Sequence, residues 1–535
     1  MDAPGGDLEG EPESLWLASA EDTGYPALDR DLEADVAVIG AGIAGLTAAL
    51  ALKRAGRTVA VMEAARVGTG VTGHTTGKVT SLHRLAYTDL DRIHGTGTAR
   101  VYGEANQAAI GHIQRVVAEE GIDCDLRVVS NYTYAETDDA LERVRAEAAL
   151  AARLGLPSAF TTDVPLPFPV KGAVRFDGQA QIHAVKYLQG LARAVHGDGS
   201  FVFEQTRALQ VHDAGPGVVD TEGGSVRARN IIVATNVPFG DDGAFGSRCR
   251  PHRSYIVAGR VDGPPLDATF ISVDEPMRSI LTVSADAGAG GRNYVLVGGE
   301  GHPVSEAGDT AGRYNRLAAF ARDRLGVNNV AYRWSTQDNM PVDGLPYVGL
   351  MSADARHVYV ITGLRKWGLT NGTAAALILA DTISGRVNPW AAVFDSNRAT
   401  PDRPATPDRP ATAEGTATPE GTASPENVSE AENDSNQSGE ASPVTPDRIT
   451  LAPGEGTVLD VAGKSTAVYK DADGIIHSLS AICTHLGCTV EFNPADTTWD
   501  CPCHGSRFAV DGTVIHGPAN RDLPPGPEHL PESLT

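Results

Sequence analysis

The chain has 535 residues, of which 41% are hydrophobic, so it is long enough for two or three domains with sizeable cores. Its formal net charge of -24 argues against binding to nucleic acid or to an anionic membrane surface. Residues 1–30 predict an N-terminal extension without a secretory pattern, and no stretch reaches about eighteen uninterrupted apolar residues. We therefore expect a soluble, cytoplasmic protein without a membrane anchor.

The first predicted elements form one unit. Residues 35–39, in which Asp35 is followed by an apolar run at 36–39, predict a buried strand that leads into a glycine-rich turn. Residues 46–55 then predict a helix, and residues 57–62 predict a second strand. This order of strand, turn, helix and strand predicts a dinucleotide-binding unit.

The glycines of this turn have separate expected roles. Gly40 permits the tight turn, Gly42 allows close approach of a pyrophosphate, and Gly45 lets the helix pack against the strand. The phosphates are expected at the helix N-terminus, where backbone N–H groups are free to bind them. Glu63 follows about twenty residues later, where it can accept hydrogen bonds from ribose hydroxyls. The chain has no second strand followed by such a glycine-rich turn, so we expect it to bind one dinucleotide.

The middle of the chain predicts a second layer. Residues 98–120 and 138–154 predict amphipathic helices with alanine-rich faces, which we interpret as scaffold for substrate binding. Residues 254–261 and 292–298 predict strands of the sheet in that layer.

Four further segments carry a family resemblance. They are the glycine- and threonine-rich stretch 66–77, the strand-like 230–236, and the segments 337–346 and 361–370. Together with the glycine turn, they resemble the FAD-dependent D-amino-acid oxidase superfamily, which includes glycine oxidase-like and dimethylglycine dehydrogenase-like members. The resemblance covers about 31–394.

This resemblance implies an α/β, Rossmann-like FAD-binding domain interleaved with an α+β substrate domain over 31–396. The FAD layer is expected at about 31–85, 172–245 and 335–396, and the substrate layer at about 86–171 and 246–334. Gly372 and the alanine-rich run after it are expected to begin a helix aimed at the flavin. The expected cofactor-binding residues are Gly40, Gly42, Ile43, Ala44, Gly45, Glu63, Arg66, Thr72, Gly73, His74, Thr75, Gly363, Trp367, Gly368, Leu369 and Thr370.

His74 has two interpretations. Dimethylglycine dehydrogenase-like proteins have a histidine at the corresponding place that is bonded to the flavin, so the resemblance allows a covalent FAD through His74. The residues around His74 differ from that subfamily. The other interpretation is a polar residue that forms hydrogen bonds near the flavin.

Four residues are candidates for catalysis or substrate binding. Arg253 and Tyr255 begin the predicted substrate strand, and an arginine there can pair with a carboxylate. His302 follows another strand, and Lys366 lies beside the segment expected at the flavin. Each also has an ordinary interpretation as a residue of sheet packing, of a solvated turn, or of the backbone near the flavin.

Residues 397–446 predict a disordered linker. The segment has no Leu, Ile, Met, Phe, Tyr or Trp and consists of Pro-, Thr-, Gly- and Ser-rich repeats. Such a composition cannot bury enough apolar area to offset the entropy cost of ordering. A flexible coil of this length has a root-mean-square span of roughly 40 Å, which suits either a moving tether or a passive spacer.

The C-terminal segment carries two Cys-x-His-type pairs. Cys483 and His485 form the first pair, and Cys501 and His504 form the second. Two thiolates and two imidazoles suit the two irons of a mixed-ligand [2Fe-2S] cluster, whose potential lies above that of an all-cysteine cluster. A zinc site uses the same residue types at similar spacing.

Residues 448–524 resemble Rieske domains of the cytochrome bc-complex type, within a predicted all-β domain at 447–535. The resemblance implies a disulfide between Cys488 and Cys503, and it makes Ser506 a hydrogen-bond donor to the cluster. Phe508 stands where the high-potential proteins have tyrosine, which indicates a moderate potential. Gly517-Pro518 resembles the proline loop that covers the cluster.

The leading hypothesis is a flavoenzyme that oxidises an amine or amino acid and passes electrons singly through the cluster to a soluble acceptor protein. In the alternative, a ferredoxin-type donor reduces the cluster, and electrons flow to FAD for a reductive or oxygen-dependent reaction. A non-catalytic redox sensor is a third possibility. A Rieske oxygenase would need a mononuclear iron site of two histidines and a carboxylate, and no stretch shows that pattern.

Overall fold

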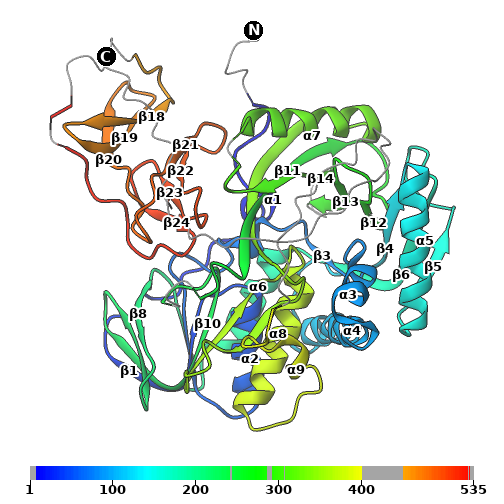
Figure 1. The fold of residues 1–535 in the computed structure, drawn as a ribbon, viewed down its shortest axis with the longest axis horizontal. Coiled ribbons are helices and arrows are strands. Elements are labelled where there is room, and N and C mark those ends of the chain that lie inside the picture. Colours follow the sequence, from blue (N-terminus) through cyan, green and yellow to red (C-terminus); the bar gives the residue numbers. More distant parts are fainter. Residues whose placement is uncertain are drawn as a thin grey trace, which may run out of the picture.

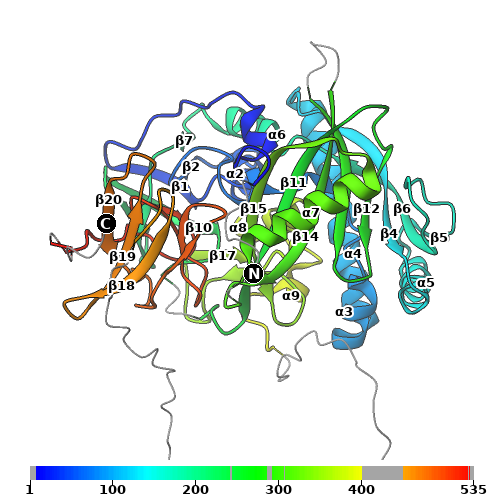
Figure 2. The same cartoon turned by 90° about the horizontal axis from the view of Figure 1, so that it is seen from above.

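The computed structural model describes residues 8–240, 244–285, 292–306, 308–400, 450–527 and 529–530. These residues form a main body (8–400) and a C-terminal domain (450–530), which lies at one end of the long axis (Figures 1 and 2). Most of the linker predicted at 397–446 lies outside the described residues. In the part of the chain that is described, no helix is long and apolar enough to span a membrane.

One sheet of the main body is built on parallel strands. Its main path is β16-β17-β10-β1-β2-β7, and β9 pairs with both β10 and β8. The strands are β1 (Leu32–Ile39), β2 (Val59–Met62), β7 (Phe201–Phe203), β8 (Ala208–His212), β9 (Gly217–Thr221), β10 (Ser225–Asn236), β16 (Tyr347–Leu350) and β17 (Val358–Thr362). β10 lies parallel to β1, which confirms that 230–236 leads back into this sheet.

Both faces of this sheet are covered by other parts of the main body. Successive residues of a strand point to opposite faces, so neighbouring residues of β1 enter different cores. Val36 and Val38 share a core with the helices α2 (Ile43–Arg54), α6 (Ala184–Val195) and α8 (Gly368–Ile383). Ala37 and Ile39 belong instead to a core on the opposite face, to which β8 and β9 contribute. Burial of both faces explains why 36–39 has a continuous apolar sequence.

A larger, mostly antiparallel sheet forms the second layer. Its path is β15-β11-β14-β13-β12-β4-β6-β3, with β5 paired to β6. The strands are β3 (Lys78–Val79), β4 (Arg127–Ala135), β5 (Ser158–Thr161), β6 (Gly172–Gln181), β11 (Cys249–Val261), β12 (Ala268–Ser272), β13 (Arg278–Ala285), β14 (Arg292–Pro303) and β15 (Asn329–Pro341). The helix α7 (Thr310–Leu325) packs on β11 and β14, and α5 (Asp138–Arg153) packs on β4, β5 and β6.

The helices connect the two layers. The helices α3 (Ala86–His94) and α4 (Thr96–Glu119) pack together, and α4 also packs on α8. The helix predicted at 98–120 is therefore present, but it shares its core with the parallel sheet as well as with the second layer. The α9 helix (Ala391–Phe394) follows α8 and contacts α4.

Three layer boundaries differ from the expected ones. β3 was expected in the FAD layer but pairs with β6 in the antiparallel sheet. β6 was expected in the FAD layer but pairs with β4 in the antiparallel sheet. β15, expected to enter the FAD layer from 335 onward, is the partner of β11 along its whole length. Their backbone hydrogen bonds decide this, because an apolar pattern does not specify which sheet a strand joins. The α8 helix begins at Gly368 rather than at Gly372.

The described part of the N-terminal extension is packed onto the main body. The α1 helix (Leu15–Ala18) carries Trp16, which is fully buried and donates a 2.6 Å hydrogen bond to the carbonyl of Thr75. The Ser14 hydroxyl donates a 2.6 Å bond to the carbonyl of Gly73. The extension therefore supports the loop at 66–77.

The C-terminal domain is all β, as predicted. One sheet contains β18 (Gly456–Val461), β19 (Lys464–Lys470) and β20 (Ile476–Ser480), and the other contains β21 (Glu491–Asn493), β22 (Thr498–Asp500), β23 (Arg507–Ala509) and β24 (Val514–His516). Its core includes Trp499, Phe508 and Val490, each with no exposed side-chain surface. The segments that precede β21 and β23 carry the two Cys-x-His-type pairs.

Candidate active site

The glycine turn after β1 is shaped by close backbone contacts. Gly40 has φ +102°, and a Cβ there would lie 2.8 Å from the carbonyl oxygen of Ala234. A Cβ at Gly45 would lie 1.9 Å from the carbonyl oxygen of Gly40. Gly42 is different, because its nearest neighbour would be the Thr72 hydroxyl at 3.4 Å. Only at Gly42 does the turn leave room for a ligand to approach the backbone.

The start of α2 is suited to an anion. Gly42 is its N-cap and forms no side-chain cap, and the first turn of this described helix holds no acidic residue. Glu63 accepts hydrogen bonds from the backbone N–H groups of Ala41, at 2.9 Å, and Ala65, at 3.1 Å. Burial raises the pKa of Glu63. The Ile43 N–H donates a 3.2 Å hydrogen bond to the Thr72 hydroxyl. A helix N-terminus with a nearby carboxylate fits the pyrophosphate and the ribose of a dinucleotide.

A cavity of about 2100 Å³ extends from this turn between the two layers. It is lined by many of the residues expected at the cofactor, namely Gly40, Gly42, Ile43, Ala44, Glu63, Thr72, Thr75, Trp367, Gly368 and Leu369. The other expected residues do not line it: Gly45, Arg66, Gly73, His74, Gly363 and Thr370. The lined set comes from the glycine turn, from 66–77 and from the start of α8, so an extended FAD fits this cavity.

The N-terminus of α8 forms part of the cavity wall. Trp367 is its N-cap without a side-chain cap, and Gly368 and Leu369 line the cavity. The Trp367 ring stacks on His83 with centroids 4.6 Å apart. Burial lowers the pKa of His83 to about 3, so this imidazole is neutral. No sequence motif marks His83, which reaches the cavity only because β3 and α8 pack together.

His74 is turned toward its own loop. Its Nδ1 lies 2.9 Å from the carbonyl oxygen of Gly70, and its backbone carbonyl accepts a 3.0 Å hydrogen bond from Trp334. His74 does not line the cavity, whereas its loop neighbours Gly70, Val71, Thr72, Thr75 and Thr76 do. The arrangement supports the interpretation of His74 as a hydrogen-bonding residue rather than a flavin-bonded one.

Polar groups cluster on the cavity wall made by β11, β14 and the segment before α8. The Tyr255 hydroxyl lies 3.0 Å from His302 Nε2, and Lys366 Nζ donates a 3.0 Å hydrogen bond to the Ser254 hydroxyl. Asp338 lines the same cavity. Burial lowers the pKa of Lys366 to about 8 and raises the pKa of Asp338 to about 6.

Strained backbone is concentrated at this cavity. Among the described residues, the non-glycine residues with positive φ that line it are Arg84, Asn236, Glu300, Arg365 and Lys366. Lys366 has φ +64° and follows Arg365 with φ +56°. Non-glycine residues rarely adopt this conformation, and it persists where the surrounding structure imposes it, often at functional sites.

Arg253 does not line the cavity. Its guanidinium forms a hydrogen-bonded ion pair with Asp500 of the C-terminal domain, and it donates a 2.9 Å bond to the Gln337 side chain. This differs from the prediction that Arg253 pairs with a substrate carboxylate, because a carboxylate of the chain itself occupies that position. Sequence alone could not show which carboxylate faces the arginine.

The two Cys-x-His-type pairs meet at one end of the C-terminal domain. Cys483 and Cys501 are buried, and their hydrogen bond lowers the pKa of the Cys483 thiol. The rings of His485 and His504 are 5.0 Å apart, and the buried Nδ1 of His504 has no hydrogen-bond partner among the described residues. Two thiols and an unpaired imidazole nitrogen fit the ligand set of a [2Fe-2S] cluster.

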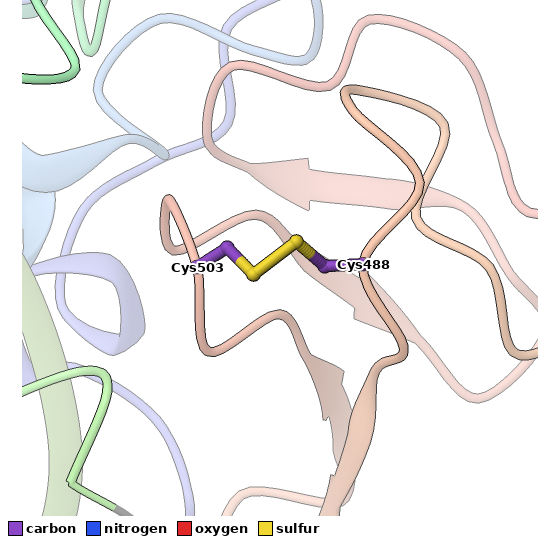
Figure 3. Close-up of a disulfide and its surroundings, with 2 residues drawn as sticks. All are labelled: Cys488 and Cys503. Carbon is purple, nitrogen blue, oxygen red and sulfur yellow. A yellow bond between two sulfur atoms is a disulfide. The ribbon is translucent and has the colours of Figure 1, made fainter. Parts of the chain in front are cut away.

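A disulfide joins the two ligand loops through Cys488 and Cys503 (Figure 3). The sulfurs of Cys488, Cys501 and Cys503 lie within 4.8 Å of one another, and the disulfide removes two of them as metal ligands. The Ser506 side chain forms a hydrogen bond to Cys483 that lowers the pKa of this thiol, and its role as a donor to the cluster remains a prediction. At Gly517, φ is +115° and a Cβ would lie 2.4 Å from the Cα of Ser506, so the proline loop packs against the second ligand loop.

The cluster loops face the main body. Cys503 and His504 line the large cavity together with residues 514–520. His485, His504 and Pro518 also line a smaller void with Pro238 and Pro251 of the main body. The flavin-type cavity and the cluster site are therefore adjacent, although their residues are far apart in sequence.

Comparisons with known proteins agree with this architecture. Residues 35–382 match the family model "FAD dependent oxidoreductase", and residues 444–527 match "Rieske [2Fe-2S] domain". The putative Rieske 2Fe-2S iron-sulfur protein YhfW of Bacillus subtilis is 33% identical over 96% of this chain and 97% of its own. The gamma-glutamylputrescine oxidoreductase of Escherichia coli is 25% identical over 70% of this chain and 89% of its own.

The fold of the main body is shared with a solved structure. The glycine oxidase of Geobacillus kaustophilus superimposes with a TM-score of 0.57 and 20% identity, and the match covers 69% of this chain and all of that one. The predicted FAD and [2Fe-2S] cofactors, the all-β iron–sulfur domain and the oxidoreductase class are confirmed. The chain belongs to the family of FAD-dependent oxidoreductases of the D-amino-acid oxidase type, and it carries a C-terminal Rieske [2Fe-2S] domain.

Proposed function

We propose that the protein oxidises an amine or amino acid at FAD and that the Rieske domain carries the electrons, one at a time, to an external acceptor protein. The observation that supports this most directly is the shared cavity. Its wall includes the FAD-type glycine turn and the cluster ligand His504. A substrate cavity and a single-electron centre are thus in contact within one chain.

The two cofactors supply different chemistry. Bound FAD accepts a hydride from a carbon beside a neutral amine, and a Rieske cluster exchanges single electrons. The residues expected to hold FAD are those of the glycine turn, of loop 66–77 and of the start of α8. The cluster ligands are Cys483, His485, Cys501 and His504, as the Rieske match implies.

Residues of the cavity wall can hold an amino acid by its charges. Lys366 supplies a cation and Asp338 an anion, and both line the cavity. Burial lowers the pKa of His302 to about 4, so its ring is neutral, with Nδ1 donating a 2.8 Å hydrogen bond to the Pro303 carbonyl and Nε2 accepting one from the Tyr255 hydroxyl. The hydroxyl of Tyr255, 3.0 Å from His302, fixes the orientation of that ring.

The amine substrate class has independent support from relatives. Glycine oxidase and gamma-glutamylputrescine oxidoreductase are named for compounds that carry an amino group. These names apply to those proteins, and they guide the choice of compounds to test on this chain.

Anaerobic stopped-flow spectroscopy tests the proposal. Amines and amino acids are first screened for bleaching of the flavin absorbance, and a compound that bleaches it is then mixed rapidly with the protein. The proposal requires that the flavin band falls first and the cluster band second. If a reduced ferredoxin-type donor bleaches the cluster before the flavin and no amine bleaches either, electrons flow in the reverse direction.

A further inference from the structure

Two strands of the antiparallel sheet contact the cavity with some residues and the C-terminal domain with the residues between them. On β15, Thr336, Asp338 and Met340 line the cavity, whereas Ser335 and Gln337 bond to the C-terminal domain. Such alternation is a property of strand geometry, in which successive side chains point to opposite faces. β15 therefore has a cavity face and a second face.

The neighbouring strand β11 repeats this arrangement over residues 252–254, and beyond the register shift that follows, Tyr255 and Ile256 both line the cavity. His252 and Ser254 line the cavity, and Arg253 between them bonds to Asp500. Tyr314 of α7 adds a hydroxyl that donates a 2.8 Å hydrogen bond to Asp496. We call the set Arg253, Tyr314, Ser335 and Gln337 the docking face.

The C-terminal domain meets the docking face with two carboxylates. Arg507 of the same domain donates to Asp500 at 2.9 Å and to Asp496 at 2.7 Å. Ser335 donates a 2.7 Å bond to Asp496, and Arg507 donates a 2.8 Å bond back to Ser335. Two carboxylates thus share two guanidinium groups, one from each side of the interface.

This network is buried. The side chains of Arg253 and Asp500 are 6% and 15% exposed, and those of Arg507 and Asp496 are 10% and 13% exposed. Removing one partner of such a network leaves a charge buried without its partner, which is costly. Without the main body, the two carboxylates Asp500 and Asp496 would keep hydrogen bonds from Asn493 and would share the single positive charge of Arg507.

The backbone of the C-terminal domain also packs closely against the main body at this interface. Gly505 has φ +77°, and a Cβ there would lie 2.3 Å from Gln337 Nε2 and 3.0 Å from the Pro251 Cβ. Gln337 Nε2 donates a 2.7 Å hydrogen bond to the Gly505 carbonyl. At a second place, Asn520 donates a 2.7 Å bond to the carbonyl of Leu209.

The docked position has a consequence for the cavity. Residues 503–504 and 514–520 of the C-terminal domain form part of its wall. Undocking would remove that wall and expose the cavity to solvent there. The same contacts that hold the domain therefore also determine whether the cavity is closed on this side.

We propose that the docking face is a binding site for one partner, the Asp496–Asp500 carboxylate pair of the chain's own Rieske domain. Arg253 and Tyr314 are its positioning residues, and they set the fraction of molecules in which the Rieske domain closes the flavin cavity. This role of Arg253 replaces the substrate role that the sequence suggested.

Full-length protein loaded with FAD and cluster tests this proposal without any substrate. Small-angle X-ray scattering measures the compact fraction, and iodide quenching of flavin fluorescence measures access to the cavity. Arg253→Gln is expected to lower the ratio of docked to undocked protein about 30-fold or more, because it leaves Asp500 short of a buried partner. Tyr314→Phe, which removes one hydrogen bond to a carboxylate, is expected to lower the ratio about fivefold.

Arg386→Gln is the matched control. Arg386 pairs with Asp381 at the surface of the main body, so its variant is expected to behave as the wild type does. Quenching by iodide is expected to rise in the order wild type, Tyr314→Phe, Arg253→Gln.

Several results would overturn the proposal. One is wild-type scattering and quenching in Arg253→Gln with normal flavin and cluster spectra. If Arg253→Gln does not fold, unchanged values in Tyr314→Phe would have the same meaning. A wild-type protein that scatters as a dimer would place the Rieske domain of a second copy on the face. None of these measurements depends on turnover, so a failed amine screen leaves this proposal intact.

Discussion

Two glycines of the turn after β1 give opposite predictions for the same small substitution. Gly42→Ala is expected to weaken FAD binding without harming the fold. The added Cβ would lie no nearer to the protein than 3.4 Å, from the Thr72 hydroxyl, and it would project where the pyrophosphate is expected. Gly45→Ala is expected to harm the fold, because its Cβ would lie 1.9 Å from the Gly40 carbonyl oxygen.

The expected magnitudes follow from these distances. In Gly45→Ala, helix α2 must move away from the turn, and overpacking of this kind costs about 1–3 kcal/mol of unfolding free energy. Gly42 is the N-cap of α2, where replacing glycine by alanine costs about 1 kcal/mol or less. Displacing the pyrophosphate in Gly42→Ala is expected to raise the Kd for FAD at least about tenfold, equivalent to about 1.4 kcal/mol.

Both quantities can be measured on full-length protein after removal of the flavin. Titration with FAD, followed by flavin fluorescence, gives the Kd, and thermal unfolding of the flavin-free protein gives the stability. Gly97→Ala is the control, since a Cβ at Gly97 would meet nothing within 4 Å. Wild-type affinity in a folded Gly42→Ala variant would refute the placement of the pyrophosphate at this turn. Wild-type stability in Gly45→Ala would refute the helix–strand contact.

Three more predictions concern the two redox sites. If Lys366 and Asp338 hold the substrate by their charges, kcat/KM is expected to be highest between about pH 6, where Asp338 ionises, and about pH 8, where Lys366 loses its proton. Asp338→Asn should remove the acid limb and shift the alkaline limb to lower pH, because the Asp338 charge raises the pKa of Lys366; an unchanged profile would contradict this. Ser506→Ala is expected to lower the cluster's midpoint potential in a redox titration, since it removes a hydrogen bond to Cys483, and an unchanged potential would exclude that role. Wild-type protein on a denaturing gel is expected to show no flavin fluorescence, whereas a fluorescent band that His74→Ala abolishes would establish a covalent bond through His74.

Much of the architecture was predictable because its signals are local. The glycine turn, the apolar run at 36–39 and the spacing of the Cys-x-His-type pairs each specify a short structure whose physical reason lies within a few residues. The helices predicted at 98–120 and 138–154 appear at 96–119 and 138–153 for the same reason. The all-β C-terminal domain followed from its resemblance to Rieske domains.

Assignments that depend on pairing were less predictable. β6 and β15 joined the antiparallel sheet rather than the FAD layer, because hydrogen-bond partners far along the chain select the sheet. His83 reached the cavity through the packing of β3 and α8, and no pattern in the sequence marks it. Alternation along β11 turned Arg253 away from the cavity, and a strand prediction without a register cannot specify that.

The sequence by itself determined which cofactor chemistries the chain carries, since each binding motif is a short run of residues with a fixed local geometry. Only the tertiary structure decided that the two chemistries meet. The cavity wall combines residues from the glycine turn with His504, and these are separated by most of the chain. Their meeting depends on a buried network of charges between Arg253, Asp500, Arg507 and Asp496. Such a network forms only when two folded surfaces come together, so no single segment of the sequence contains it.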